Sequence, residues 1–398
     1  GYYYETSENN FEKIPGNRIG YWLTNKTIEN INDSNALEEY ADPCTGMQTG
    51  RNSEFIRSWY ETNNLDIINN GGAIWNFYMM GGKGVKWYGN LDKVILWEND
   101  GKVVKEFKGS VVRNERFFRR KGISWKRITS SENTIRYLPE NFIFDQSADS
   151  LFPKSDGMFN YLLGIFNSKV ISSLLEIFSA TLNLTSGSVS DIPIVFSEKN
   201  KTKIDELVID CISISKKNWD MHETSWDFKY SPLLANKSDG LIASAYESYK
   251  TQVNERFMKL KENEEELNRI FIEIYGLGDE LTSDVLDKDI TVAKIFDKKE
   301  DIDEGIKGNK YIMTREDVVK NYLSYFVGCL MGRYSLDVEG LAYAGGDFDL
   351  DKYSSFNVDV DGVLPLTDAQ YFEEDIVEIF IQFLKVTFGE EHLNENLN

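Results

Sequence analysis

The chain has 398 residues, of which 44 are basic and 65 acidic, so its formal net charge is −21. Its 41% hydrophobic residues suffice for one large core or two ordinary ones, which excludes an intrinsically disordered chain. No apolar stretch is long enough to span a membrane and no basic, then apolar leader opens the chain, so we expect neither a membrane protein nor a secreted one. Taken alone, the acidic balance also argues against a nucleic-acid partner.

The first half of the chain is predicted to form short strands. Apolar and aromatic runs separated by glycine and asparagine are typical of strands. The sequence Asn99-Asp100-Gly101 predicts a hairpin turn, because Asp and Gly tolerate the positive φ that such turns need. One helix is predicted over 159–177, where apolar residues recur at three- and four-residue steps. The predicted strands cover 73–80, 94–97, 103–107, 116–118, 135–138 and 142–144.

After about Gly240 the apolar spacing becomes helical. A long helix is predicted over 246–274, interrupted on its apolar face only by Glu264, and Gly276 should end it. Residues 276–312, rich in Asp and Lys, are expected to form a solvated connector. Two more helices should each begin at a side-chain cap: Thr314 with Asp317 for a helix that runs to Met331, and Thr367 with Gln370 for a helix near the C-terminus.

These elements predict an α+β chain of two domains. A strand-rich domain with a packed helix would cover 1–200, and a mainly helical acidic domain would cover 201–398. Residues 241–398 carry 16 basic and 34 acidic side chains, so most of the negative charge lies there. Residues 83–127, in contrast, hold 13 basic and five acidic side chains; we call this segment the basic island.

Patterns for a catalytic centre are missing from the sequence. It has neither the glycine-rich turn nor the N/D-P-P-Y/F loop of an amino-methyltransferase, and Gly82-Lys83 is not followed by Ser or Thr, as a P-loop requires. We therefore expect no catalytic residue in this chain.

Metal sites are also not expected. The cysteines Cys44, Cys211 and Cys329 are scattered and form no C-x-x-C pair, which argues against zinc and indicates buried thiols and a cytoplasmic location. Two acidic patterns resemble metal sites. Asp92, Asp100 and Lys102 suggest a nuclease, although Asp100 is better explained by the hairpin turn, and residues 357–362 resemble a calcium loop without its final Glu.

The basic island contains the candidate binding residues. Arginines can pair with phosphates and grip guanine edges with two parallel bonds, and here they alternate with Phe117, Phe118 and Trp125. The alternative is an amphipathic strand with a solvated basic face and its aromatic side chains in the core. The candidate DNA-binding residues are Arg113, Arg116, Arg119, Arg120, Lys121, Lys126 and Arg127, together with Lys83 and Lys86.

Several longer motifs resemble one known family, the PglX adenine-specific DNA methyltransferases of bacteriophage-exclusion (BREX) systems. The similarity is to the C-terminal half of that family, and type IIG restriction-modification enzymes resemble the chain more distantly. The motifs include Gly46-Met-Gln-Thr-Gly-Arg-Asn52, Lys86-Trp-Tyr-Gly-Asn90, Asn167-Ser-Lys169, Glu223-Thr-Ser-Trp-Asp-Phe228 and Gly332-Arg-Tyr-Ser-Leu-Asp337.

The resemblance implies a division of labour. The catalytic domain that binds S-adenosylmethionine would lie upstream, with residues 1–52 leading in from it. This chain would carry target recognition over 1–200 and a helical C-terminal region. Its partners would be double-stranded DNA, its own upstream methyltransferase domain and other BREX proteins. The loop 46–52 and the helix around 167–169 resemble target-recognition signatures with an architectural role. Two alternatives remain open: a scaffold that docks other defence proteins, and a nuclease-bearing type IIG relative.

Overall fold

The computed structural model describes residues 25–68, 72–126, 134–178, 185–359, 361–364 and 375–398. The chain divides into two compact units, each described below by itself. Unit 1 consists of residues 1–62, 66–216 and 259–291, and unit 2 of residues 63–65, 217–258 and 292–398. The helix α10 (Ile242–Tyr275) therefore contributes its first half to unit 2 and its second half to unit 1.

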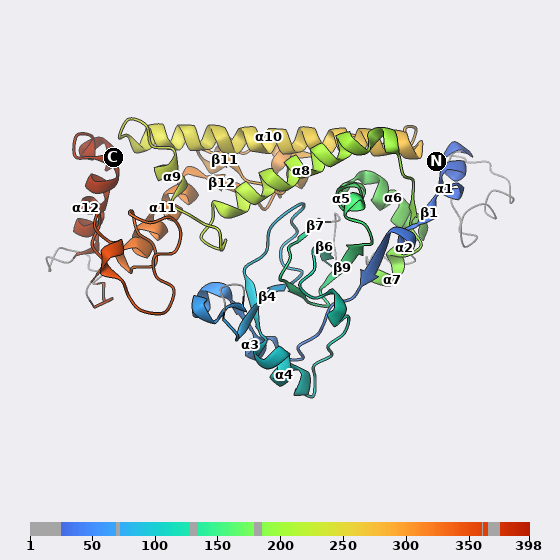
Figure 1. Ribbon diagram of the computed structural model, residues 1–398. Coiled ribbons are helices and arrows are strands. Elements are labelled where there is room, and N and C mark those ends of the chain that lie inside the picture. Colours follow the sequence, from blue (N-terminus) through green and yellow to red (C-terminus); the bar gives the residue numbers. More distant parts are fainter. Residues whose placement is uncertain (1–24, 69–71, 127–133, 179–184, 360, 365–374) are drawn as a thin grey trace. The chain divides into compact units, whose positions relative to one another are not determined.

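Two four-stranded sheets form the centre of unit 1 (Figure 1). The first is antiparallel and has the order β2-β9-β6-β7, and the second has the order β3-β5-β4-β8, in which only β4 and β8 are parallel. A short antiparallel pair, β1-β10, lies outside them. The strands are β1 (Asn35–Ala36), β2 (Ala41–Cys44), β3 (Ile56–Ser58), β4 (Trp75–Met79), β5 (Lys93–Leu96), β6 (Gly122–Lys126), β7 (Ile135–Leu138), β8 (Ile143–Phe144), β9 (Ala148–Pro153) and β10 (Pro193–Ile194).

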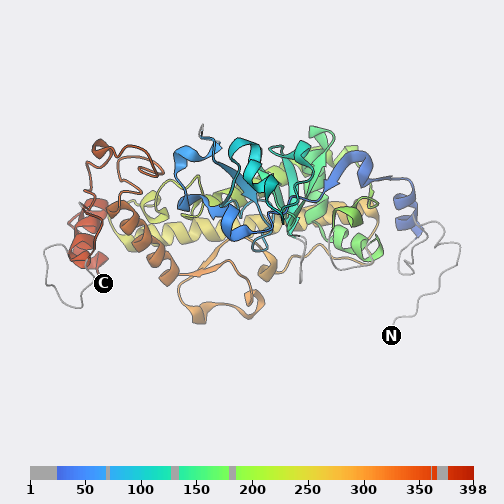
Figure 2. The ribbon, with the colours of Figure 1, turned by 90° about the horizontal axis from the view of Figure 1, so that it is seen from below.

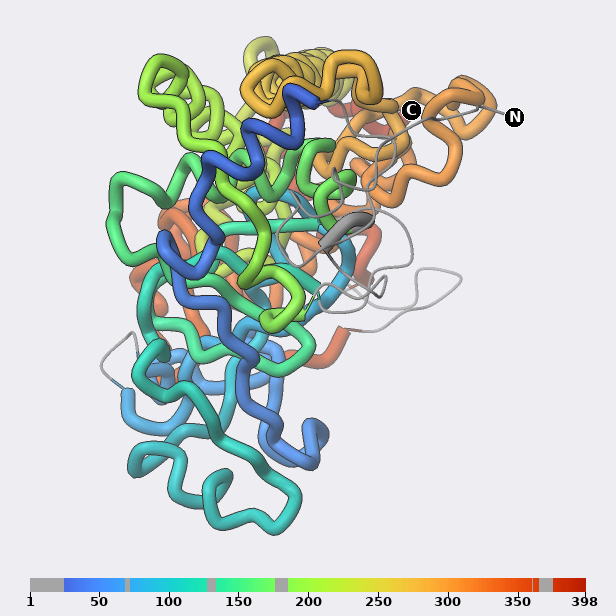
Figure 3. Tube along the Cα trace, turned by 90° about the vertical axis from the view of Figure 1, so that its right-hand side faces the viewer, coloured from blue at the N-terminus to red at the C-terminus, as the bar shows by residue number. Residues whose placement is uncertain are grey.

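Helices pack around these sheets. Figure 3 shows α1 beside the C-terminal end of α10, where the Thr27 hydroxyl donates to the carbonyl of Gly276 over 3.1 Å. Gly276 has a φ of +72° and ends α10, as predicted. The other helices of unit 1 are α1 (Asn25–Asn32), α2 (Leu37–Tyr40), α3 (Asn52–Phe55), α4 (Glu98–Glu106), α5 (Phe159–Asn167), α6 (Lys169–Phe178), α7 (Ser186–Val189) and most of α8 (Glu198–Asp220).

Unit 2 is mainly helical and has a core rich in aromatic residues. Its helices are α9 (Pro232–Ala235), α11 (Arg315–Leu330), α12 (Ile376–Phe388) and α13 (Leu393–Asn396), and a parallel pair joins β11 (Lys294–Phe296) to β12 (Ile312–Thr314). Figure 2 shows α11 and α12 close together, where the ring of Tyr322 lies 5.8 Å from that of Phe383.

The α+β class is confirmed, and so are the strands predicted over 73–80, 94–97, 135–138 and 142–144. The hairpin at Asn99–Gly101 is wrong. All three residues do have positive φ, as predicted for a turn. The residues that follow are helical, however, so that 103–106 is part of a helix that buries Val104 and not a strand. The strand predicted over 116–118 is wrong too, because Glu115–Phe117 is a 3₁₀ turn.

The helix predicted over 159–177 is two helices. Ser168 is extended, with ψ of 160°, and its hydroxyl donates to the carbonyl of Ile165, which ends α5. The amide of Lys169, which begins α6, donates to the side chain of Asn268 over 2.8 Å. A cap supplied by a distant residue cannot be read from local spacing.

Of the remaining predictions, one is confirmed, one lies outside the described residues and one is wrong in part. The cap of α11 is confirmed, since the amide of Thr314 donates to the Asp317 carboxylate over 2.8 Å. The cap at Thr367 and Gln370 lies outside the described residues, and α12 is capped by Asp375. The solvated connector is wrong in part, because residues 276–312 contain β11, β12 and buried apolar side chains: Leu277, Val285, Ile290, Val292, Ala293, Ile295 and Ile306.

In the part of the chain that the structure describes, no helix combines the length and the apolar character that a membrane crossing requires. The thiols of Cys44, Cys211 and Cys329 are free and buried, as predicted.

Candidate nucleic-acid interface

The loop 46–52 supports the segment that leads into the arginines of the basic island. The amide of Gln48 donates to the carbonyl of Val111 over 2.9 Å, and the amide of Val111 donates back over 2.8 Å. Gly50 has a φ of +74°, and a Cβ there would lie 2.4 Å from the backbone of Gly109. Only glycine fits so close an approach in that conformation. The prediction that this loop is architectural agrees with these contacts.

Two aromatic side chains anchor the arginine-bearing turn in the core. Phe117 is 2% exposed and stacks on Phe152 with ring centroids 4.6 Å apart. Phe118 meets the edge of Trp97 at 5.7 Å. Because consecutive residues are fixed in the core, the arginines on either side of them are held at the surface. The aromatic side chains therefore point inward, as the alternative interpretation expected, although the segment is not a strand.

Arg116 and Arg120 lie together. Their guanidinium carbons stand 4.8 Å and 5.3 Å from the centroid of the same Phe117 ring. Both charges also act on the nearby thiol of Cys44. Burial raises the pKa of that thiol to about 11, and Asp42 adds to the increase, while the two arginines oppose it. Two cations on one aromatic ring form a local concentration of positive charge at the surface.

The exposed arginines of this segment have no carboxylate within ion-pair distance among the described residues. This holds for Arg113, Arg116, Arg119 and Arg120. Lys105, in the same island, pairs with Asp100 at 2.8 Å and with Glu115 at 2.6 Å. These four arginines therefore carry positive charge that no carboxylate among the described residues pairs with, and so do the exposed Lys83, Lys102 and Lys108 of the same island.

The lysines are spread over other places. Lys121 is half-buried, with its ammonium 4.1 Å from the centre of the Phe159 ring. Lys126 lies at the far end of β6, about 16 Å along an extended strand from Lys121, and packs beside Gly81. Lys83 is exposed on the loop that follows β4. Arg127 lies outside the described residues.

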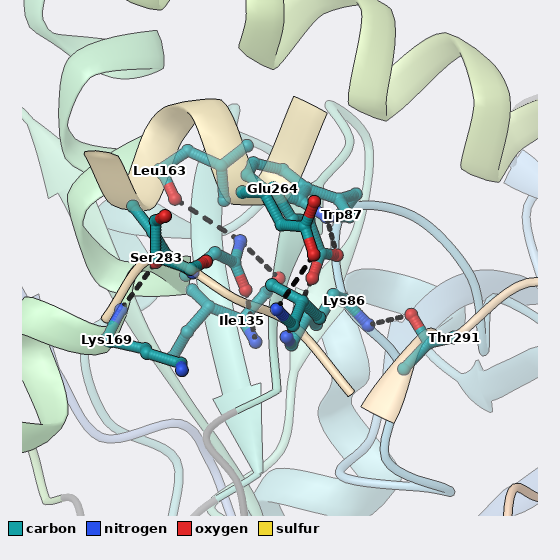
Figure 4. A network of polar contacts seen from close by, with 12 residues as sticks. Lys86, Trp87, Ile135, Leu163, Lys169, Glu264, Ser283 and Thr291 are labelled. Carbon is teal, nitrogen blue, oxygen red and sulfur yellow. Dashed lines mark hydrogen bonds and ion pairs between the residues drawn. The ribbon is translucent and has the colours of Figure 1, made fainter. Parts of the chain in front are cut away.

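Lys86 is buried and belongs to an internal network of unit 1 (Figure 4). Its ammonium pairs with the Glu264 carboxylate at 3.0 Å, and the indole N–H of Trp87 donates to the other oxygen of Glu264 at 2.8 Å. Lys86 therefore adds no charge to the surface. Trp87 and Trp125 are likewise buried.

The same network shows what the Asn167-Ser-Lys169 motif does. The Asn167 side chain donates to the carbonyl of Ile135 at 2.9 Å and accepts from the amide of Ile135 at 3.3 Å. These bonds fasten the end of α5 to β7. The role of this motif is architectural.

Neither a metal nor S-adenosylmethionine fits the described residues. They contain no cluster of three metal-ligating side chains, and Asp92 and Asp100 are each paired with a lysine, at 3.0 Å and 2.8 Å. Nucleotide-like cofactors often bind at the carboxyl ends of the strands of a doubly wound parallel sheet. Among the described strands only the pairs β4-β8 and β11-β12 are parallel, so the described residues provide no such sheet.

Comparison with known proteins places these features in context. No family profile matches the chain. It is 36% identical over its whole length to the adenine-specific methyltransferase PglX of Lacticaseibacillus casei, of which it covers 33%. It is 34% identical over 98% of its length to the adenine-specific methyltransferase BrxX of Escherichia coli, of which it covers 32%. The chain thus spans about a third of the length of these relatives. The resemblance predicted from the motifs is confirmed: the chain is similar, from end to end, to a portion of the PglX and BrxX methyltransferases, consistent with a C-terminal portion.

Proposed function

We propose that this chain is the DNA target-recognition and C-terminal part of an adenine-N6 DNA methyltransferase of a BREX-type phage-defence system, acting in the cytoplasm. The observation that carries the proposal is the set of exposed arginines Arg113, Arg116, Arg119 and Arg120, which have no carboxylate partner among the described residues. Guanidinium groups that no internal carboxylate pairs with are available to phosphates and base edges.

The chemistry of adenine methylation explains why such a surface is needed. An enzyme that methylates N6 must turn the adenine out of the duplex into a pocket, so another part of the protein must hold the flanking duplex. Phosphate contacts position the duplex, and contacts to base edges specify the site. In this proposal the pocket and S-adenosylmethionine belong to a methyltransferase domain outside this chain, and the arginines hold the duplex.

The distribution of charge limits where DNA can lie. Residues 241–398 carry 34 acidic and 16 basic side chains, so a duplex is repelled from most of that surface. The island's arginines are the attractive region, and the acidic part keeps DNA from binding in other orientations.

The proposal is tested by removing the two arginines that share Phe117. The double variant R116A/R120A deletes two exposed cations and no hydrogen bond of their guanidinium groups within the described residues. Binding to a 30-base-pair duplex is measured by fluorescence anisotropy over a salt series, both for this chain and for the full-length protein. If each arginine contacts a phosphate, the log–log salt slope falls by about 0.9 for each.

A matched control removes the same charge elsewhere. K307A/K320A deletes two exposed lysines of unit 2 and should leave affinity and slope unchanged. If R116A/R120A binds with unchanged affinity and unchanged slope, the arginine surface is not the DNA interface.

A protein-docking function is the second candidate, and one feature of unit 2 favours it. Four apolar side chains four residues apart are exposed along α11 and just after it, namely Val319, Leu323, Val327 and Met331. Exposed apolar stripes are typical of protein interfaces. In cells, L323D would reduce phage resistance while leaving duplex binding unchanged if another defence protein docks there.

A further inference from the structure

Arg119 differs from the other arginines of the island in how its backbone is held. Its φ is +64°, a left-handed conformation that is uncommon for residues other than glycine. Its amide donates to the carbonyl of Phe142 at 2.8 Å, and its carbonyl accepts from the amide of Asn141 at 3.2 Å. Asn141 is also left-handed, with a φ of +70°. Strained residues that are held from both sides often occur at functional sites.

A buried asparagine orients the side chain of Arg119. Asn76 lies in β4, is fully buried, and donates through Nδ2 to the carbonyls of Phe77 and Asn141, each at 2.8 Å. Two carbonyl acceptors fix which end of the amide carries the hydrogens. Its Oδ1 therefore faces Arg119 as an acceptor and receives a hydrogen bond from Nε at 3.0 Å.

This arrangement leaves the outer edge of the guanidinium free. Only Nε is used, and Nη1 and Nη2 have no partner among the described residues of this exposed side chain. Asp100 lies near Arg119: its hydrogen bond with Lys105 lowers the pKa of the Asp100 carboxyl most, and the charge of Arg119 adds to that decrease without an ion pair between the two. Arg120, the next residue, lies over the Phe117 ring, and its guanidinium donates no hydrogen bond to the described residues.

We propose that Arg119 is a base-reading residue, whose Nη1 and Nη2 donate two parallel hydrogen bonds to O6 and N7 of a guanine in the major groove. A flexible cationic side chain can bind a phosphate in many orientations, but a bidentate contact with a guanine edge requires the guanidinium to lie at one position and in the plane of the base. A guanidinium that a buried amide already holds loses less conformational entropy on binding. This favours the guanine contact, which requires exact placement of the side chain. The inference rests on the proposed function, because it assumes that this surface faces DNA.

The experiment compares Arg119→Lys with Arg120→Lys in the full-length protein. Each variant binds a pool of duplexes with a randomised 20-base-pair core, and sequencing of the bound fraction gives the base preference at every position. Lysine keeps the charge and loses the planar fork. Arg119→Lys should lower the preference for guanine at one position by roughly 10-fold or more, as expected for loss of a bidentate contact. Arg120→Lys should leave all preferences within about two-fold.

The outcomes separate this inference from the proposed function. Unchanged preferences in Arg119→Lys overturn the inference, and so does an Arg119→Ala variant that loses affinity equally for all sequences with a salt slope smaller by about 0.9, which indicates a phosphate contact. Wild-type protein that binds DNA with no guanine preference also overturns the inference and leaves the proposed function intact. Unchanged binding of R116A/R120A overturns the proposed arginine surface, and the inference, which assumes that surface, is overturned with it.

Discussion

Substitution of Glu264 should destabilise unit 1 strongly. The Glu264 side chain is 3% exposed and the Lys86 side chain 8%, and the carboxylate accepts both from that ammonium and from the indole N–H of Trp87. Glu264→Ala removes the acceptor of both donors. It leaves a lysine ammonium in the interior without this carboxylate.

The magnitude follows from the burial of both partners. Removing one member of a buried pair typically costs about 3–5 kcal/mol, because the remaining charge has lost its compensation. A buried donor left without its acceptor costs about 1–3 kcal/mol, and this partly overlaps with the first effect. We expect a loss of about 3–5 kcal/mol for Glu264→Ala. Replacing both residues by apolar ones of similar size, as in K86M/E264L, should recover much of this loss.

Urea unfolding followed by tryptophan fluorescence measures these changes, since the buried Trp59, Trp87 and Trp125 all lie in unit 1. The exposed pair of Glu316 and Lys320 on α11 supplies the control, because Glu316→Ala should cost less than about 1 kcal/mol. A loss below about 1 kcal/mol for Glu264→Ala, or a double variant as unstable as the two single variants combined, would refute the reasoning.

Two further predictions concern stability. Gly50→Ala should destabilise the protein by roughly 2 kcal/mol or more, because the φ of Gly50 is positive and the new Cβ would meet the Gly109 backbone. The control Gly187→Ala should be neutral or stabilising, because nothing lies within 4 Å of its new Cβ. Thermal melts of both variants measure these changes, and equal effects would contradict the prediction. Hydrogen bonds from Lys250, Tyr246 and Arg315 hold the pKa of Asp297 below its usual value, so this carboxylate stabilises the fold at neutral pH and loses that contribution as the pH falls below about 4. Asp297→Asn should therefore be less stable than wild type at pH 7 and should lose less stability on acidification, which a pH series of melts measures against Asp303→Asn; parallel curves for Asp297→Asn and wild type would contradict the assignment.

Periodicity and turn chemistry predicted the strands β4, β5, β7 and β8 and the helices α10 and α11, but not the helix α8 or the strands β2, β3, β6 and β9. The end of α10 at Gly276 and the cap of α11 at Thr314 depend on neighbours a few residues away, so local sequence suffices. The strands over 75–79 and 135–138 were predicted for the same reason. The hairpin at Asn99–Gly101 failed because turn residues indicate positive φ and leave the conformation of the next residues open.

The candidate site was less accessible from the sequence. Lys86 and Arg116 have the same kind of sequence neighbourhood, yet one is buried against α10 and the other is exposed on Phe117. The difference depends on a partner 178 positions away. One signal was visible: Glu264 interrupts the apolar face of a long helix, and a carboxylate at such a position requires a buried donor. Nothing in the sequence identifies which lysine supplies it.

The ion pairs change what the charge of the basic island means. Lys93 pairs with Asp92, Lys105 pairs with Asp100 and Glu115, and Lys86 pairs with Glu264 in the interior. Those pairs have little net field at a distance, because opposite charges a few ångströms apart cancel and salt screens what is left. The field that a phosphate backbone would meet therefore comes from the arginines of 113–120 and from the exposed Lys83, Lys102 and Lys108, which have no ion pair among the described residues. A count of charges along the sequence detects the island, and only the pairing within the fold shows which part of it is free to act.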